Sequence, residues 1–205
     1  TAVLVVLVAA ASACRGALEF STSGLETVNV GGTLRAPEVT LAMWTKFSAA
    51  ALSELQGLLH HTAWTVSSGG VSTHWMVWHS RYRLSINGIN TNVGGCCSDF
   101  PGTGGLLVAD TWQHAAVRLS LGTRSRYELL TDGTLADTMT VTNKNGNSEF
   151  IVLPAVVGDY NDNVRQLQGS LADVRVFSAW LSNADAVALA GGGSSGSLTT
   201  PPRVE

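Results

Sequence analysis

The stretch LQGSLADVRVFSAWL, residues 167–181, carries the strongest fold signal in the chain. Two sets of side chains alternate along it: Leu171, Asp173, Arg175 and Phe177 against Ala172, Val174 and Val176. Successive side chains of a strand point to opposite faces of a sheet, so this alternation predicts a two-faced strand. Residues 181–190 (LSNADAVALA) come next and predict a short helix capped by Ser182 or Asn183.

From Ala17 onward, short runs rich in Val, Leu, Thr and aromatic residues alternate with Gly, Ser, Asn and Asp clusters, as in an all-β protein. In the clearest run, residues 39–47 (VTLAMWTKF), four apolar side chains share one face and Thr40, Trp44 and Lys46 share the other. This pattern predicts a half-buried strand. Further strands are predicted at residues 25–30, 55–60, 74–79, 82–86, 105–108, 114–119, 127–131, 138–142, 151–157 and 171–177. About eleven short strands fit two stacked antiparallel sheets better than one open sheet.

Four motifs follow one another in a recognisable order: WQHAAV at 112–117, YELLTDG at 127–133, VVGD at 156–159 and the stretch at 167–181. This order resembles the laminin-G-like jelly roll of the concanavalin A-like lectin/glucanase superfamily, over residues 17–190. Asp185 and Ala186 depart from the Glu and Ile usual at the start of that family's last helix. The resemblance implies an all-β fold, a two-sheet antiparallel jelly-roll sandwich of the concanavalin A-like type with one short C-terminal helix.

The composition excludes several classes of protein. Lys and Arg number 12 against 15 Asp and Glu, a net charge of -3, so the chain lacks the basic surface that nucleic acid requires. Hydrophobic residues make up 45% and charged residues 13%, which excludes disorder driven by charge. The mean hydropathy of +0.19 comes almost entirely from residues 1–14. The rest therefore has the composition of a soluble domain with an uncharged polar surface, which suits an extracellular module.

The two ends of the chain differ from the domain between them. Residues 2–13 are an apolar run ending in Ala11-Ser12-Ala13, a small-residue cleavage pattern, so residues 1–16 are predicted to be a signal-peptide-like segment. The alternative is a buried strand. Residues 17–190 form the predicted domain, and residues 191–205 have the composition of a linker. We therefore expect a secreted or cell-surface protein that contacts a membrane only through an uncleaved N-terminus.

The chain holds three cysteines, Cys14, Cys96 and Cys97, none at zinc-finger spacing. In an oxidising compartment they are disulfide candidates. Either Cys96 or Cys97 could form a disulfide bond with Cys14 or with a cysteine of another chain, so the disulfide connectivity stays open.

Catalytic patterns are missing from the sequence. The resemblance implies that an enzyme of this superfamily would carry its carboxylates on one strand as E-x-D-x-x-E, and no such run occurs. A G-x-S-x-G nucleophile motif is also missing. The closest acidic pair by spacing, Asp159 and Asp162, falls in a predicted loop. A non-catalytic protein is therefore expected.

Two kinds of binding residue are candidates. Asp159, Asn161 and Asp162 concentrate oxygen donors in one turn, as calcium requires, although Asp and Asn are also ordinary turn residues. Aromatic platforms for a sugar are Trp64, Trp75, Trp78 and Tyr82. Trp75 and Trp78 lie an odd number of positions apart, so one of them should be in the core. The tryptophans at 44, 112 and 180 are interpreted as packing residues.

The function predicted from these features is a non-catalytic extracellular module of a larger protein that recognises a glycan or an extracellular protein. One alternative is a structural subunit that self-associates. A less favoured alternative is a diverged glycan-degrading enzyme.

Overall fold

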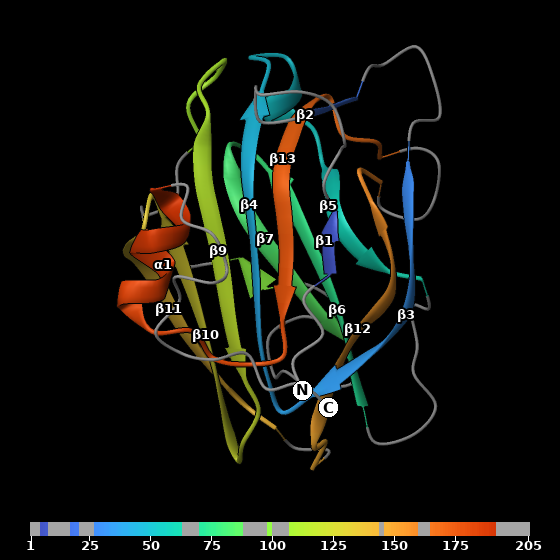
Figure 1. Cartoon of the computed structure of the whole chain (residues 1–205), viewed down its shortest axis with the longest axis vertical. Helices are drawn as coiled ribbons and strands as arrows, with labels where there is room; N and C mark the ends of the chain where they lie inside the picture. Colours follow the sequence, from blue (N-terminus) through green and yellow to red (C-terminus); the bar gives the residue numbers. More distant parts are fainter. Residues whose placement is uncertain are drawn as a thin grey trace.

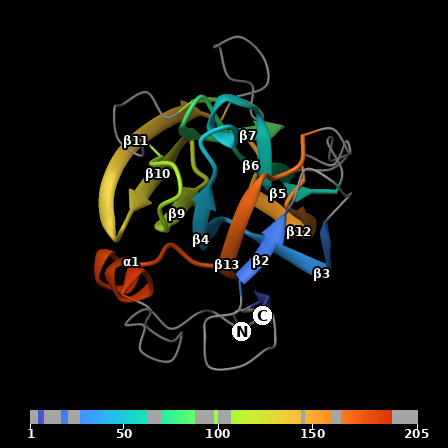
Figure 2. The same ribbon diagram turned by 90° about the horizontal axis from the view of Figure 1, so that it is seen from above.

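The computed structural model describes residues 5–7, 17–20, 27–62, 70–87, 98–99, 107–143, 146–159 and 165–191. Two β-sheets stack face to face, and one short helix lies on the outer side of one of them (Figures 1 and 2). In the described part of the chain, no helix is long and apolar enough to cross a membrane.

The first sheet has seven strands and carries the helix on its outer face. Its order is β1-β13-β4-β9-β10-β11, and β2 also pairs with β13. These strands are β1 (Val5–Leu7), β2 (Ala17–Phe20), β4 (Glu38–Phe47), β9 (Gln113–Ser120), β10 (Arg124–Thr131), β11 (Thr134–Thr142) and β13 (Gly169–Phe177).

The second sheet has six strands in the order β3-β12-β5-β6-β7-β8. They are β3 (Val28–Ala36), β5 (Gln56–His61), β6 (Gly70–Trp78), β7 (Arg81–Asn87), β8 (Ser98–Asp99) and β12 (Glu149–Val157). Every pairing in the two sheets is antiparallel except a short parallel one between residues 149–151 of β12 and 70–72 of β6. A short 3-10 helix, η1 (Ala51–Ser53), follows β4. The predicted all-β sandwich of two sheets with one C-terminal helix is confirmed.

The predicted half-buried strand at 39–47 is more deeply buried than its pattern indicates. Its four apolar side chains face the second sheet as predicted, and each has at most 1% exposure: Val39, Leu41, Met43 and Phe47. Thr40 and Ala42, on the opposite face, are equally buried. Ala42 is buried by the apolar side of the helix α1 (Asn183–Ala190). Thr40 is buried by the segment that precedes this helix, because its hydroxyl donates to Ala179 O and accepts from the Leu181 N–H.

The helix begins where the sequence predicts. Ser182 is the N-cap: its hydroxyl accepts a hydrogen bond from the backbone N–H of Asp185, and the Asp185 carboxylate accepts one from the Ser182 N–H. A second apolar cluster joins the helix to the sheet: Ala42, Ala116, Leu130, Phe177, Leu181, Ala186 and Leu189.

Two segments behave differently from their predictions. The prediction of a strand at 105–108 is wrong for residues 107 and 108, which the structure describes and which lie outside any strand. The Leu107 N–H instead donates to the Ser80 carbonyl at 2.9 Å, which fastens this segment to the β6–β7 turn.

In the N-terminal run, Val5–Leu7 form the edge strand β1 on Val174–Val176 of β13. This short pairing corresponds to the strand alternative. The signal-peptide segment stays a prediction.

Candidate functional site

Two of the predicted sugar platforms lie in the core. Trp75 and Tyr82 are 0% and 1% exposed, with ring centroids 5.8 Å apart. The Tyr82 hydroxyl is 2.7 Å from Oγ1 of Thr45, and burial raises the pKa of Tyr82 above its usual range. Both side chains face the opposite sheet, so the prediction that they bind a surface ligand is wrong. Trp75 is the core member expected of its pair; Trp64 and the side chain of Trp78 lie outside the described residues.

The predicted calcium ligands are described only in part. Asp159 follows β12 and is 2% exposed, directly after Gly158, whose φ is +84°. The Gly158 N–H donates to Leu58 O at 3.1 Å, and its carbonyl accepts from Leu167 N at 2.9 Å, so Asp159 starts a firmly held turn. Asn161, Asp162 and the three cysteines fall outside the described residues. Within those residues, no group of three or more His, Cys, Asp or Glu side chains is arranged to hold a metal ion.

A surface that sequence reasoning missed lies on the outer face of the first sheet, beyond the part that α1 covers. We call it the Trp44–Trp112 face. It comprises Trp44, Lys46, Trp112, His114, Asp132, Asp173 and Arg175. These residues come from the C-terminal end of β4, the N-terminal end of β9, the β10–β11 turn and the middle of β13, which lie beside one another in the sheet (Figure 1).

The aromatic part of the face combines two indoles with a cation. Trp112 is 37% exposed, and Nζ of Lys46 lies 5.4 Å from its ring centroid. This is within the range of a cation–π contact. One step along the strands, Trp44 pairs with His114, and their rings meet edge to face at 5.4 Å and 66°.

The β10–β11 turn brings a carboxylate to the same place. Asp132 and Gly133 have φ values of +50° and +78°, as in a tight Asp-Gly hairpin turn. Oδ1 of Asp132 accepts a hydrogen bond from the His114 N–H at 2.9 Å, and the Asp132 N–H donates to His114 O at 2.8 Å. A Cβ at Gly133 would lie 2.9 Å from Cα of Val187, so the turn also packs closely against the helix.

His114 is the least solvated polar group of the face. It is 3% exposed, and burial lowers its pKa to about 4 although the carboxylates of Asp132 and Asp173 act in the opposite direction. Its imidazole is therefore neutral at physiological pH. Among the described residues, Nδ1 of this ring has no hydrogen-bond partner.

An ion pair completes the face on β13. Asp173 has a φ of +53° and sits in the irregularity between Ala172 and Arg175. Its two carboxylate oxygens accept hydrogen bonds from Nε and Nη2 of Arg175 at 2.6 and 2.7 Å. The pair therefore presents a planar, charge-balanced group beside Trp44.

The signal that could have found this face is present in the sequence. Trp112 and His114 lie two residues apart, as do Trp44 and Lys46, so each pair must share a face of its strand. The packing interpretation is wrong for Trp112, which is exposed. It holds for Trp180, whose ring lies 5.0 and 5.3 Å from the guanidinium carbons of Arg118 and Arg126.

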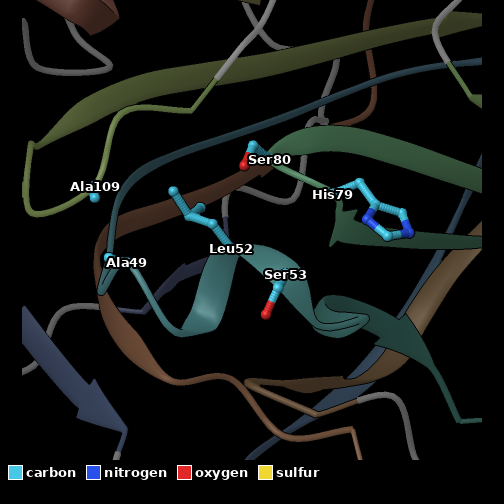
Figure 3. Close-up of a pocket in the computed structure, with 6 residues that line it drawn as sticks. All are labelled: Ala49, Leu52, Ser53, His79, Ser80 and Ala109. Carbon is cyan, nitrogen blue, oxygen red and sulfur yellow. The ribbon is translucent and has the colours of Figure 1, made fainter.

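A hollow of about 360 Å³ lies at the rim of the sandwich, beside η1 and the β6–β7 turn (Figure 3). It is lined by Ala49, Leu52, Ser53, His79, Ser80 and Ala109. In Figure 3 the imidazole of His79 extends away from Leu52 and Ser80. The Ser53 hydroxyl already donates to Ala50 O at 2.9 Å. The hollow therefore offers few polar groups to a ligand, and the Trp44–Trp112 face is the stronger candidate.

Three solved structures are similar to this chain in fold. The receptor binding domain of botulinum neurotoxin D has a TM-score of 0.59 at 13% identity and covers 86% of this chain and 43% of its own. A neurotoxin D ligand binding domain in complex with N-acetylneuraminic acid has a TM-score of 0.52 at 13% identity, with 81% and 39% covered. The chain thus spans less than half of either neurotoxin domain. A native heptameric SAP-like pentraxin from Limulus polyphemus has a TM-score of 0.60 at 14% identity, with 94% and 88% covered.

Among curated proteins, nothing matches the chain. The family model Laminin_G_3, described as the concanavalin A-like lectin/glucanases superfamily, matches residues 20–186. That match includes every strand of the two sheets from β3 to β13 and the start of α1. The chain therefore belongs to the Laminin_G_3 family of the concanavalin A-like lectin/glucanase superfamily.

Proposed function

We propose that this chain is a non-catalytic binding module that recognises a carbohydrate through the Trp44–Trp112 face. The observation that carries the proposal is the exposed Trp112 indole, with Lys46 beside it on the same face as Asp132. A sugar ring presents C–H groups that pack on an indole, and hydroxyls that bond to charged and planar polar groups around it. The receptor binding and ligand binding named for the two neurotoxin domains support a recognition function.

The state of the two carboxylates on the face supports a non-catalytic role. Retaining hydrolysis needs one carboxyl group as nucleophile and a second as acid, about 5 Å apart. Both oxygens of Asp173 are bound to Arg175, and one oxygen of Asp132 is bound to the His114 N–H. Neither group is arranged as a free acid, so the face is suited to holding a ligand rather than cleaving it.

The cellular context is part of the same proposal. An extracellular location is supported by the apolar run with its Ala11-Ser12-Ala13 pattern and by the weakly charged domain surface. Calcium at Asp159, Asn161 and Asp162 would brace the turn after β12. A rise in melting temperature with calcium that Asp159→Asn abolishes would support this site, whereas no change in either protein would remove it.

An extracellular protein is the second candidate partner, including a further copy of this chain. Strand β11 ends the first sheet, so among the described strands only β10 pairs with it. An edge strand of this length can extend a sheet across two molecules. The heptameric pentraxin supports assembly of this fold. Light scattering that gives a monomer mass at high protein concentration would exclude stable self-association.

The test of the main proposal is a glycan array with the wild-type chain and Trp112→Ala. We expect loss of at least about tenfold in affinity for the bound glycans, in the range of an exposed aromatic contact in a binding site. Arg81→Gln is the matched control, because Arg81 is exposed on the other sheet. Melting temperatures of all three proteins should agree. Equal glycan binding by wild type and Trp112→Ala would refute the proposal.

A further inference from the structure

One cation of the Trp44–Trp112 face is not balanced by an acid. In the part of the chain that the structure describes, Lys46 forms no ion pair, and its recorded contact is with the Trp112 ring. The neighbouring cations of the sheet differ from it: Arg175 is held by Asp173, and Arg118 and Arg126 share Glu128. The Lys46 ammonium therefore keeps its capacity to bind an anion.

The position of Lys46 restricts where that anion would sit. Lys46 is half-buried between the strands and its Nζ lies over an indole that is 37% exposed. A cation held against an aromatic ring loses some of its water without gaining a counter-charge. An anionic group that reaches Nζ would lie close to the Trp112 ring, and the rest of its molecule could pack on the exposed part of the indole.

The opposite end of the face has the opposite polarity. Asp132 is exposed, and one of its oxygens is used by the His114 N–H. The Asp132 carboxylate can accept hydrogen bonds from hydroxyl or amide N–H groups. Its negative charge would repel a second anion there. The face therefore fits a ligand with one acidic end, a ring of sugar size, and donor groups at its other end.

Resting on the proposed function, we propose that the ligand is an acidic sugar. A carboxylate attached to its ring binds the Lys46 ammonium while the ring itself packs on Trp112. An ammonium–carboxylate hydrogen bond is about twice as strong as a neutral one, so the carboxylate supplies the selectivity. Asp132 receives the hydroxyl or amide donors. Neutral sugars keep the contacts with Trp112 and Asp132, lack the ion pair with Lys46, and bind more weakly.

The test uses methyl glucuronoside and methyl glucoside, which differ in the group at C6 only. Affinities are measured by NMR titration of the wild type, Lys46→Gln, Trp112→Ala and the control Arg81→Gln. We expect the wild type and the control to prefer the glucuronoside by about threefold to fivefold, near the upper limit for a partly exposed ion pair. Lys46→Gln should reduce this preference to about one, because it weakens glucuronoside binding more than glucoside binding. Trp112→Ala should weaken both sugars.

The outcomes separate the two proposals. Equal affinity of the wild type for both sugars, with loss of both in Trp112→Ala, would overturn the acidic ligand and keep the binding module. If the wild type binds neither sugar, and Trp112→Ala binds the glycans of the array as the wild type does, the acidic ligand and the binding module are both overturned. Salt gives a second measurement if Lys46→Gln does not fold. Raising it from about 0.02 M to about 0.5 M should remove the glucuronoside preference of the wild type, because screening weakens exposed ion pairs. A preference that salt does not alter would also overturn the acidic ligand.

Discussion

Three buried histidines make the stability of this domain depend on pH in a range where carboxylates have not yet begun to titrate. His60 on β5 and His74 on β6 are both 0% exposed and face each other across the two strands. Their Nδ1 atoms are 2.6 Å apart, and Nε2 of His74 is 3.1 Å from the Ser72 hydroxyl. One Nδ1 must donate and the other accept, so a proton added to the accepting nitrogen would remove this hydrogen bond.

The direction of each pKa change follows from the surroundings of the ring. Burial, then Arg165 and His61, lower the pKa of His60 to about 3. Burial, then His60 and His61, lower the pKa of His74 to about 2. His114 has its pKa lowered to about 4, mainly by burial. All three rings therefore stay neutral in the folded state down to about pH 5.

In the unfolded chain each of these histidines titrates at its ordinary pKa of 6.5. Between that pKa and the lowered ones, the unfolded state binds protons that the folded state does not, so stability falls as pH falls. At pH 5 the unfolded pKa lies about 1.5 units above the pH, which corresponds to about 2 kcal/mol per histidine and about 6 kcal/mol for three. Domains are stable by about 5–15 kcal/mol, so this loss is a large share of the total.

The measurement is urea unfolding, followed by circular dichroism, at several values from about pH 7.5 to about pH 5. We expect the free energy of unfolding to fall by several kcal/mol across this range. His74→Gln should lower the stability at neutral pH and reduce the slope by about one proton. His79→Asn is the control, because His79 is exposed and its φ of +50° suits Asn. A flat profile in the wild type, or a slope reduced equally by His79→Asn, would refute the reasoning.

Two further pairs of substitutions test the packing of the sandwich by chemical denaturation. Glu128→Gln should cost about 3–5 kcal/mol, because Glu128 is 1% exposed and is the carboxylate that a 3% exposed arginine binds. Glu149→Gln, which breaks a half-exposed pair, should cost less than about 1 kcal/mol, and equal losses in the two would contradict this account. Gly158→Ala should destabilise by more than Gly32→Ala. Both residues have a positive φ, but a Cβ at Gly158 would overlap the ring of Phe20, whereas the one at Gly32 meets open space. Similar losses at the two glycines would show that backbone strain alone accounts for both.

The sequence was most informative where burial follows a simple period. The strand at 39–47 could be predicted because its inner face repeats every second residue. The strand at 171–177 was predicted on the same ground, but the grouping of its side chains is wrong at Leu171, because the irregularity between Ala172 and Arg175 puts Leu171 in the core with Val174 and Val176. The helix could be predicted because Ser182 and Asp185 form a capping pair at its start. Each of these signals is contained in a few neighbouring residues.

Contacts between distant strands could not be predicted in the same way. The His60–His74 pair depends on the register of β5 and β6, which is shifted by an irregularity between Gly57 and Leu59. The burial of Trp75 and Tyr82 depends on which side of β6 and β7 faces the other sheet. An alternation in the sequence gives two faces without saying which one is inside. The candidate platforms were therefore assigned by residue type, and two of them fall in the core.

The length of α1 explains why the Trp44–Trp112 face exists at all. A helix of 8 residues is about 12 Å long, whereas a strand of 10 residues such as β4 is about 33 Å long. Laid on the outer face of the sheet, α1 can cover about a third of each strand. It covers the part at Ala42 and Ala116, where side chains are small. The next outward positions along the same strands are Trp44 and His114, then Lys46 and Trp112, where large polar and aromatic side chains begin. The change from small to large residues along β4 and β9 therefore marks the end of the helix contact and the start of the surface proposed to bind sugar.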